Sequence, residues 1–386
     1  MKIIFKIFIR EVLRLKSRPS AWVLVLVIPT LIFFYLGSIY EEGAIEYVDI
    51  AIKNEDHSKL SETIIQNIEA SPKLNIIKFL NSGDDMESTF VDNPDIKGIY
   101  LIPKDFEKNI FRGEQSKLIV YTNSSNIVYG NLLYKEAATF INTVSAGINL
   151  KMFQAKGIPY KKAIKMVMPI KVITKPLFNP YYNYLYYLIP GVTTALLQMI
   201  VFFMAARSLN SEHTNKTYDE LYQLSNQSIF NIIFGKLMTY TLIGFLVGLV
   251  IFSLIYPLFG IPLSENTLFF MVIIFIFSLV NAMLGMMISA IFKEEAIAMD
   301  MSFVYNSPAF VFSGFTFPMM AMPAFESWYA QLIPYTHFLK AFIKGFEMNT
   351  PFHYLYPQII NLMLFFLFGY AVTVVTLLIS HKKMKL

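Results

Sequence analysis

The residue types that most often carry chemistry are few in this 386-residue chain, and their spacing fits no common reaction site. The five histidines show no metal-ligand spacing, and there is no cysteine to act as a nucleophile or zinc ligand. Asp105 and Glu107 stand two residues apart, which is more typical of a solvated edge than of a catalytic pair. Ser313 and Gly314 lack the neighbours of a G-x-S-x-G nucleophile elbow. The sequence thus predicts no catalytic, metal-binding or cofactor-binding residues, and we expect no enzyme activity in the chain itself.

The composition indicates an integral membrane protein. Hydrophobic residues make up 55% of the chain and charged residues 15%, against about a quarter charged in soluble domains. A helix crosses a bilayer with about 20 apolar residues. Stretches that meet or approach this length lie at 19–40, 184–206, 231–256, 268–292, 296–317 and 357–380. The predicted fold class is therefore a membrane α-helical protein with six transmembrane helices.

Basic residues at both ends favour a cytoplasmic location for both termini. In residues 1–18, Lys2, Lys6, Arg10 and Arg14 step by four along one helical face and apolar residues fill the other, as in a helix at the membrane interface. A secretory signal peptide is the alternative, but no convincing A-x-A cleavage site follows. The chain ends in the basic HKKMKL, and an even number of spans returns it to the inside. We thus predict a multi-pass protein of the cell membrane.

Residues 41–180 are more polar, and no run among them is long enough to span a membrane. Helical spacing occurs at 60–68 and over 127–155. Strands are expected near 48–52, 74–79, 97–102 and 117–121. Strands that alternate with helices indicate a compact α/β or α+β domain. Because it follows the first span, this domain is expected to be extracytoplasmic.

The remaining region, 181–386, contains five predicted spans and a polar loop, 207–230, between the first two of them. In that loop Tyr218, Leu221 and Tyr222 recur at helical spacing, which indicates a short amphipathic helix at a membrane surface. An ordinary surface loop is the alternative.

The segment 318–350 is too long and too aromatic for a plain connection between two spans. Pro334 divides it, so we expect two short helices that re-enter the outer interface, a depth that suits Trp328 and Tyr335. A soluble amphipathic cap is the alternative.

Two features inside the predicted spans have both a functional and a structural explanation. Asp300 is an intramembrane carboxylate, which is a functional candidate by default, although contact with Lys293 or water is the preferred explanation. Gly244 and Gly248 form a G-x-x-x-G pattern that lets helices approach closely, and it is weak evidence for a dimer face.

Short motifs occur in a fixed order along nearly the whole chain. They are Ile102-Pro103-Lys104-Asp105-Phe106, Asn179-Pro180, Leu188-Ile189-Pro190-Gly191, Gly235-Lys236, Phe312-Ser313-Gly314-Phe315, Phe317-Pro318, Met322-Pro323 and Ile333-Pro334-Tyr335-Thr336. In type and order they resemble the type-2 ABC transporter permeases, exporters with a large extracytoplasmic domain after the first span. The polar loop is similar to the family's E-R-E-x-G-T-x-E-x-L segment, from which it departs at His213, Thr214 and Lys216.

This resemblance implies a permease subunit that is powered by ATP on a separate cytoplasmic ATPase. The chain itself has no G-x-x-x-x-G-K-[ST] with which to hold nucleotide phosphates. Two permeases, identical or different, would enclose the pathway. The residues expected to couple the loop to the ATPase are Glu212, Thr217, Asp219, Leu221 and Tyr222. Thr217 would cap the loop helix, and Leu221 with Tyr222 would project as an apolar knob into a groove of the ATPase.

Gly314, Pro318, Pro323 and Pro334 are the expected residues of an outer gate. The predicted cargo is amphiphilic or apolar, such as a drug, a lipid or a lipid-linked molecule, and it is moved out of the cytoplasm or the inner leaflet. The alternative is a membrane-anchored receptor or sensor in which residues 41–180 bind an external ligand or an envelope partner. Nothing in the sequence points to nucleic acid as a partner.

Overall fold

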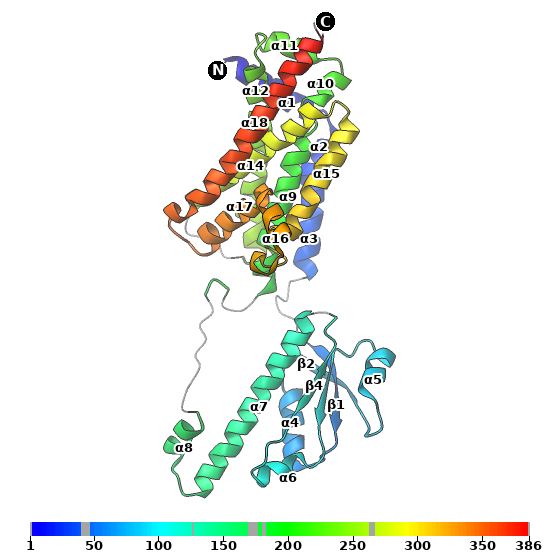
Figure 1. Ribbon diagram of the computed structural model, residues 1–386, viewed down its shortest axis with the longest axis vertical. Helices are drawn as coiled ribbons and strands as arrows, with labels where there is room; N and C mark the ends of the chain where they lie inside the picture. Colours follow the sequence, from blue (N-terminus) through cyan, green and yellow to red (C-terminus); the bar gives the residue numbers. More distant parts are fainter. Residues whose placement is uncertain are drawn as a thin grey trace. The chain divides into compact units, whose positions relative to one another are not determined.

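The computed structural model describes residues 2–39, 47–125, 127–168, 177–179, 183–261 and 267–384. The chain forms two compact units (Figure 1). The helical unit comprises Met1–Gly43 and Pro176–Leu386, and the smaller unit, Ala44–Lys175, lies between these two parts in the sequence. Separate clusters of buried apolar residues show that each unit has a core of its own.

The smaller unit is built on a four-stranded sheet in the order β2-β1-β3-β4. The strands are β1 Val48–Asn54, β2 Leu74–Phe79, β3 Gly98–Ile102 and β4 Ile119–Thr122. β1 pairs in parallel with β2 and β3, and β4 runs antiparallel to β3 at one edge. Because helices cover both faces of β1, Ile50, Ala51 and Ile52 are all buried and the strand does not alternate.

Helices pack on the two faces of this sheet through separate apolar clusters. Ile50 and Ile52 contact the side of α4 and α7, and Ala51 lies in the cluster that also contains Phe90 of α5. The helices of the smaller unit are α4 Lys59–Glu69, α5 Met86–Asp92, α6 Phe106–Phe111, α7 Ile127–Ala155 and α8 Tyr160–Val167. The structure thus confirms the four predicted strands and the two predicted helices of this region.

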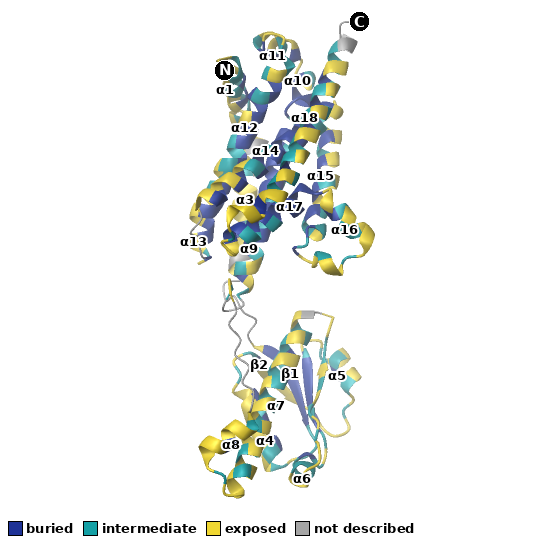
Figure 2. Ribbon diagram, turned by 60° about the vertical axis from the view of Figure 1, so that its left-hand side comes forward, coloured by how far each residue is buried: buried dark blue, intermediate teal, exposed yellow. Residues whose placement is uncertain are grey.

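Four stretches of the helical unit are long and apolar enough to cross a membrane, counted over the described residues. They contain α9 Tyr184–Ala205, α12 Ile229–Val250 with its extensions η2 Ile251–Ile255 and α13 Tyr256–Leu258, α14 Thr267–Ile291 and α18 Tyr356–Met384. α14 is central, because it packs against α9, α12 and α18. The buried share of the most apolar stretch is 67% in α9 and in α14 but 22% in α18. α18 therefore lies at the periphery (Figure 2).

The two other predicted spans are also helical. The first consists of α2 Pro19–Trp22, the π-helical turn η1 Val23–Val27 and α3 Ile28–Ile39, and the other is α15 Glu295–Phe312. Neither belongs to the four long apolar helices found among the described residues. The structure therefore supports a membrane α-helical protein with four candidate spans, and the total of six stays a prediction.

Shorter helices connect these long ones. α1 Lys2–Lys16 precedes α2, and α10 Asn210–Thr214 and α11 Tyr218–Leu224 lie between α9 and α12. Between α15 and α18 the chain forms η3 Met319–Ala321, α16 Ala324–Gln331, α17 Pro334–Phe342, η4 Ile343–Glu347 and η5 Phe352–Leu355. Two short helices, α16 and α17, are thus present on either side of the boundary expected at Pro334.

Glycines allow α12 to pack closely inside the chain. A Cβ on Gly244 would lie 2.8 Å from Ser278 Oγ of α14, and one on Gly248 would overlap the side chain of Ile274, also in α14. Both glycines are buried. Their pattern serves packing within one chain, so its assignment to a dimer face is wrong.

Candidate functional site

The end of the helical unit that carries both termini brings together α1, α10, α11 and the start of α12 (Figure 1). A buried group of polar and charged side chains joins these helices, and we call it the ionic network. Its members are Arg10, Glu11, Arg14, Glu212, Thr217, Lys236 and Tyr240. The network connects helices that lie far apart in the sequence.

Glu212 of α10 is the centre of the ionic network. Its fully buried carboxylate accepts hydrogen bonds from Arg10 Nη1 at 2.7 Å and Nη2 at 3.0 Å, so the guanidinium binds it with two parallel bonds. Arg14 donates to the same carboxylate, and Thr217 Oγ1 does so at 2.5 Å. A buried carboxylate is costly unless it is paired, and here cations from α1 compensate it.

Lys236 of α12 is the buried cation of the ionic network. Its Nζ donates to Glu11 Oε2 at 2.5 Å, Glu212 Oε1 at 2.8 Å and the Ser208 carbonyl at 2.9 Å. An ammonium has three donors, so these acceptors satisfy it completely without water. Through one side chain, α12 is therefore attached to α1 and to the chain around α10.

Glu11 completes the contact between α1 and α12. Its Oε1 accepts a hydrogen bond from the Tyr240 hydroxyl at 2.5 Å, and the residue is buried. Burial alone would raise the pKa of the Glu11 carboxyl, but the charge of Lys236 and the bonds from Lys236 and Tyr240 hold this pKa below its ordinary value. The carboxylate is therefore ionised at neutral pH, as its contact with Lys236 requires.

Gly235 explains how α1 approaches α12 closely enough for these bonds. A Cβ at this position would lie 2.6 Å from Ile7 Cβ and 3.1 Å from the Ile4 carbonyl oxygen. Only glycine therefore leaves room for α1, and the next residue, Lys236, then extends into the ionic network. The Gly235-Lys236 motif thus has a direct structural cause.

The structure corrects the predicted role of α1. Ile7 and Glu11 are buried against the protein, and Arg10 and Arg14 are paired with Glu212. The predicted basic stripe for lipid headgroups is therefore wrong in its inner half, while Lys2 and Lys6 are exposed.

The five predicted coupling residues have different environments. Glu212 and Thr217 belong to the ionic network, and Asp219 is exposed on α11. Leu221 is fully buried in the core of the helical unit, so the prediction that it projects as an apolar knob is wrong. Tyr222 is half-buried, and its ring lies 4.4 Å from that of His381 in α18.

Thr217 also differs from its predicted role. It precedes α11 as expected, but its hydroxyl donates to Glu212 and forms no capping bond to the first turn of the helix. A hydrogen bond from a hydroxyl to an ionised carboxylate is more stabilising than a hydrogen bond between a hydroxyl and a neutral N–H, because charge-assisted bonds are stronger.

The outward surface of α10 and α11 is polar. Asp219, Glu220 and Gln223 are exposed on α11, and Asn215 and Lys216 are exposed in the preceding turn. We call this group the polar face. The ionic network and buried Leu221 attach the polar face to the core of the helical unit, so its position is fixed.

The predicted outer gate residues lie at the opposite end of the helical unit, around α16 and α17 (Figure 1). Gly314 has φ +90°, a conformation that other residues rarely adopt. Pro318 and Pro323 precede η3 and α16, and Pro334 is the first residue of α17, where a proline costs no backbone hydrogen bond. Gly314 therefore follows the end of α15, and the three prolines stand at the starts of short helices.

Three of the sequence motifs meet at this end. A Cβ on Gly191 of α9 would overlap the ring of Phe315, which stacks on Tyr187 at 4.9 Å between centroids. Tyr187 donates to the Phe315 carbonyl, and the Tyr335 hydroxyl donates to the Gly191 carbonyl at 2.6 Å. We call these residues the aromatic lock. The sequence prediction did not include them, although each belongs to or adjoins a motif.

Asp300 is exposed on α15 and forms no ion pair with Lys293 or any other described residue. No cluster of three histidines or acidic residues that could hold a metal occurs in the described part of the chain.

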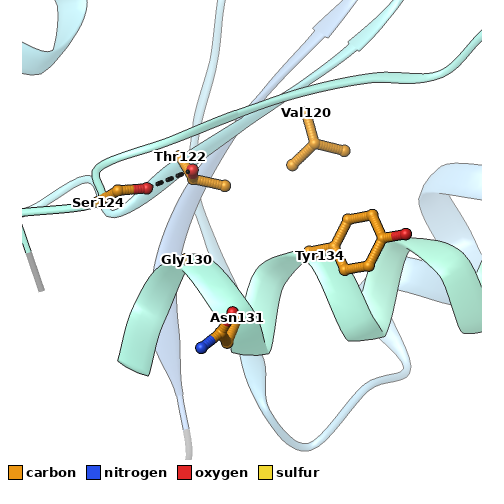
Figure 3. A pocket seen from close by; sticks show the side chains of 6 residues that line it. All are labelled: Val120, Thr122, Ser124, Gly130, Asn131 and Tyr134. Atoms are coloured by element: carbon orange, nitrogen blue, oxygen red, sulfur yellow. Dashed lines mark hydrogen bonds between the residues drawn. The ribbon is translucent and has the colours of Figure 1, made fainter. Parts of the chain in front are cut away.

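The smaller unit has an open cavity of about 310 Å³ between β4 and the start of α7 (Figure 3). Thr122 and Ser124 line one side, where their hydroxyls lie 2.9 Å apart, and Asn131 and Tyr134 line the other. Gly130 leaves the space open, because a Cβ there would lie 2.9 Å from Ser124 Oγ. The cavity is small, polar and uncharged.

Together, apolar helices, an ion-paired loop between two of them and an inserted α/β unit define an integral membrane protein of the transporter type. A family model described as "ABC-2 family transporter protein" matches residues 19–377. The chain belongs to this family, as its motifs predicted, and it is an ABC transporter permease.

Curated relatives agree with this assignment. The chain is 23% identical over 351 residues to the "Probable multidrug ABC transporter permease YbhS" of Escherichia coli strain K12, covering 86% of this chain and 85% of the relative. It is 20% identical over 358 residues to the "Probable multidrug ABC transporter permease YbhR" of the same strain, covering 91% and 93%.

Proposed function

We propose that this permease is the membrane subunit of an exporter that moves an amphiphilic or apolar cargo out of the cytoplasm or the inner leaflet. A separate ATPase subunit supplies the energy and docks on the polar face of α10 and α11. The observation that carries this proposal is the ionic network, which attaches the loop between α9 and α12 rigidly to α1 and α12.

The physical argument concerns the transmission of a push. A loop held only by its two ends would bend when a partner pressed on it. Glu212 is instead bonded to α1 and α12, and Leu221 is buried in the same core, so a displaced α11 moves these helices with it. Packed elements of this kind shift as rigid bodies.

The polar face provides the contact surface. With Leu221 buried, the groups left for a partner are Asp219, Glu220 and Gln223. Exposed acids steer an encounter with a basic surface and fix its register more than they supply affinity. We therefore infer a basic patch on the ATPase that faces these acids, with half-buried Tyr222 at the rim of the contact.

The proposed orientation places both termini and the polar face in the cytoplasm, and the smaller unit outside it. The basic residues of α1 and of the C-terminal segment support this orientation. A second permease, identical or related, completes the pathway in the cell membrane. The relatives in Escherichia coli, which are named as probable multidrug permeases, support a cargo that is varied and lipophilic.

Charge reversal on the polar face tests the docking surface. The variant Asp219→Lys with Glu220→Lys should lose co-purification of the co-expressed ATPase and efflux of ethidium from cells, at normal permease abundance. The matched control is Glu69→Lys with Glu114→Lys, two exposed acids of the smaller unit. Full ATPase recovery and efflux in the first variant would overturn the assignment of the polar face.

A further inference from the structure

A cleft of about 570 Å³ lies on the flank of the helical unit, and no member of the ionic network or the aromatic lock lines it. It is bounded by α14, α15, the end of α16, the start of α17 and α18. Its volume is within the range of roughly 300–1,000 Å³ that small-molecule sites occupy. None of the described residues that line it is charged.

One end of the cleft is polar and built around a buried histidine. His337 Nε2 lies 2.9 Å from the Gln331 carbonyl oxygen, and His337 Nδ1 lies 3.1 Å from Asn361 Nδ2. The amide nitrogen of Asn361 can only donate, so Nδ1 accepts and Nε2 carries the proton that is donated to Gln331. These bonds fix the ring and the orientation of the Asn361 amide.

The fixed orientation leaves two groups free for a ligand. The Asn361 carboxamide oxygen accepts no hydrogen bond from a described residue. The Tyr305 hydroxyl reaches the Leu332 carbonyl only at 3.5 Å, at the outer limit of a hydrogen bond. Both residues line the cleft, which therefore offers one acceptor and one hydroxyl to an uncharged polar group.

The other end of the cleft is apolar. Leu284 and Met287 of α14 and Phe365 of α18 line it, and Leu364 and Phe368 stand on its outward rim with 58% and 59% of their surface exposed. Along α18, Asn361 lies about 8 Å from Tyr356 and Phe368 about 18 Å, at roughly 1.5 Å per residue. In a hydrocarbon core about 30 Å thick, the polar end is nearer the membrane surface and the apolar end nearer its middle.

From this arrangement we infer that the cleft binds a membrane lipid from the surrounding bilayer. One acyl chain fills the apolar end, and a carbonyl oxygen of the ester group accepts a hydrogen bond from the Tyr305 hydroxyl. The phosphate headgroup stays outside, because the lining contains no cation that would recognise it. The direction of a lipid chain, polar end outward and tail inward, matches the direction of the cleft.

The bound lipid would act as a packing element between α17 and the central helices. His337 lies in the first turn of α17, and α17 packs against both α14 and α18. A lipid in the cleft would contact α17 on the side that faces the cleft, where the helix has no neighbour among the described residues to pack against. The inference needs only a bilayer around the helices, and it holds whatever cargo the permease carries and in whichever direction.

A photo-crosslinking experiment tests the inference. The whole permease is reconstituted in nanodiscs of dioleoylphosphatidylcholine with a trace of a diazirine-acyl phosphatidylcholine, and labelled peptides are mapped after illumination. Label should concentrate on peptides that contain Leu284, Met287 and Phe365. The variant Leu364→Trp, which fills the mouth of the cleft, should lower this label several-fold, and Tyr305→Phe should lower it by removing the hydroxyl that donates to the ester.

The matched control is Leu367→Trp, on the same helix, where the residue is 55% exposed but does not line the cleft. This variant should leave the label unchanged. Label spread evenly over the surface of α18, or unaffected by Leu364→Trp and Tyr305→Phe, would show an ordinary boundary lipid and overturn the inference. Displacement of the label by excess ethidium would assign the cleft to cargo instead. Disulfide-linked dimers of a Leu364→Cys variant would assign it to a second chain.

Discussion

Neutralising Glu212 is the most direct test of the ionic network. Glu212→Gln keeps the shape of the side chain and removes the charge on which Arg10, Arg14 and Lys236 converge. Removing one partner of a buried ion pair costs about 3–5 kcal/mol. The side chains of Arg10 and Arg14 are 21% and 20% exposed, so water replaces part of the lost pairing, and we expect about 3 kcal/mol, the lower end of this range.

The expected shift in melting temperature follows from this figure. A change of 1 kcal/mol moves the melting temperature of a domain of roughly this size by about 2–4 °C, which gives about 6–12 °C for the purified variant. Glu295→Gln is the matched control. Its pair with Arg207 has side chains that are 35% and 22% exposed, and such a pair contributes only about 0–1 kcal/mol.

A second measurement distinguishes loosening of α1 from general destabilisation. The chain has no cysteine, so a thiol introduced by Ile7→Cys is the sole target for a maleimide. Ile7 is 1% exposed, and labelling of this variant should be slow. Adding Glu212→Gln should accelerate it several-fold, and adding Glu295→Gln should not. Equal melting temperatures and equal labelling rates for the two glutamine variants would refute the structural role of Glu212.

Three further predictions concern other parts of the chain. Gly235→Val should displace α1, since even a Cβ would lie 2.6 Å from Ile7 Cβ, and should expose an Ile7→Cys thiol to maleimide; Gly147→Val, where nothing lies within 4 Å, is the control. Gly191→Ala should reduce ethidium efflux by forcing Phe315 out of the aromatic lock while the ATPase still co-purifies, and loss of ATPase binding would contradict this separation of the two ends. A single cysteine introduced by Asp85→Cys or Gln115→Cys should react with an impermeant maleimide in intact cells. A single cysteine introduced by Gln223→Cys should react only after the membrane is permeabilised. The reverse pattern would invert the proposed topology.

Local sequence patterns predicted the smaller unit well. Its strands and its two longest helices depend on which residues point inward within one segment, and this information is contained in periods of two and 3.6 residues. α7 runs from Ile127 to Ala155, the bounds that its apolar spacing predicted. The long apolar helices were predictable for a similar reason, because length and hydropathy are properties of a single stretch.

The contacts of α11 were not predictable in this way. Helical spacing showed that Tyr218, Leu221 and Tyr222 share a face, but not whether the protein's own core or a partner covers it. The structure shows the core, since Leu221 is fully buried. The two arginine partners of Glu212 lie on α1, about 200 positions away in the sequence, and no local pattern connects them. One signal was available: Lys236 is a cation inside an apolar helix, and such residues usually have a buried partner.

The two candidate sites are connected by a single helix, α9. Gly191, near its start, is held by Phe315 and Tyr335, and Ser208, just beyond its end, accepts a bond from Lys236 of the ionic network. With 22 residues at about 1.5 Å each, α9 spans about 33 Å, and its part from Gly191 onward, beyond Pro190, leads to the ionic network. A movement of α10 therefore reaches Gly191, where no space exists beside the Phe315 ring. If a partner docks at the polar face and moves α9, we expect the Phe315 ring either to move with α9 or to leave its position.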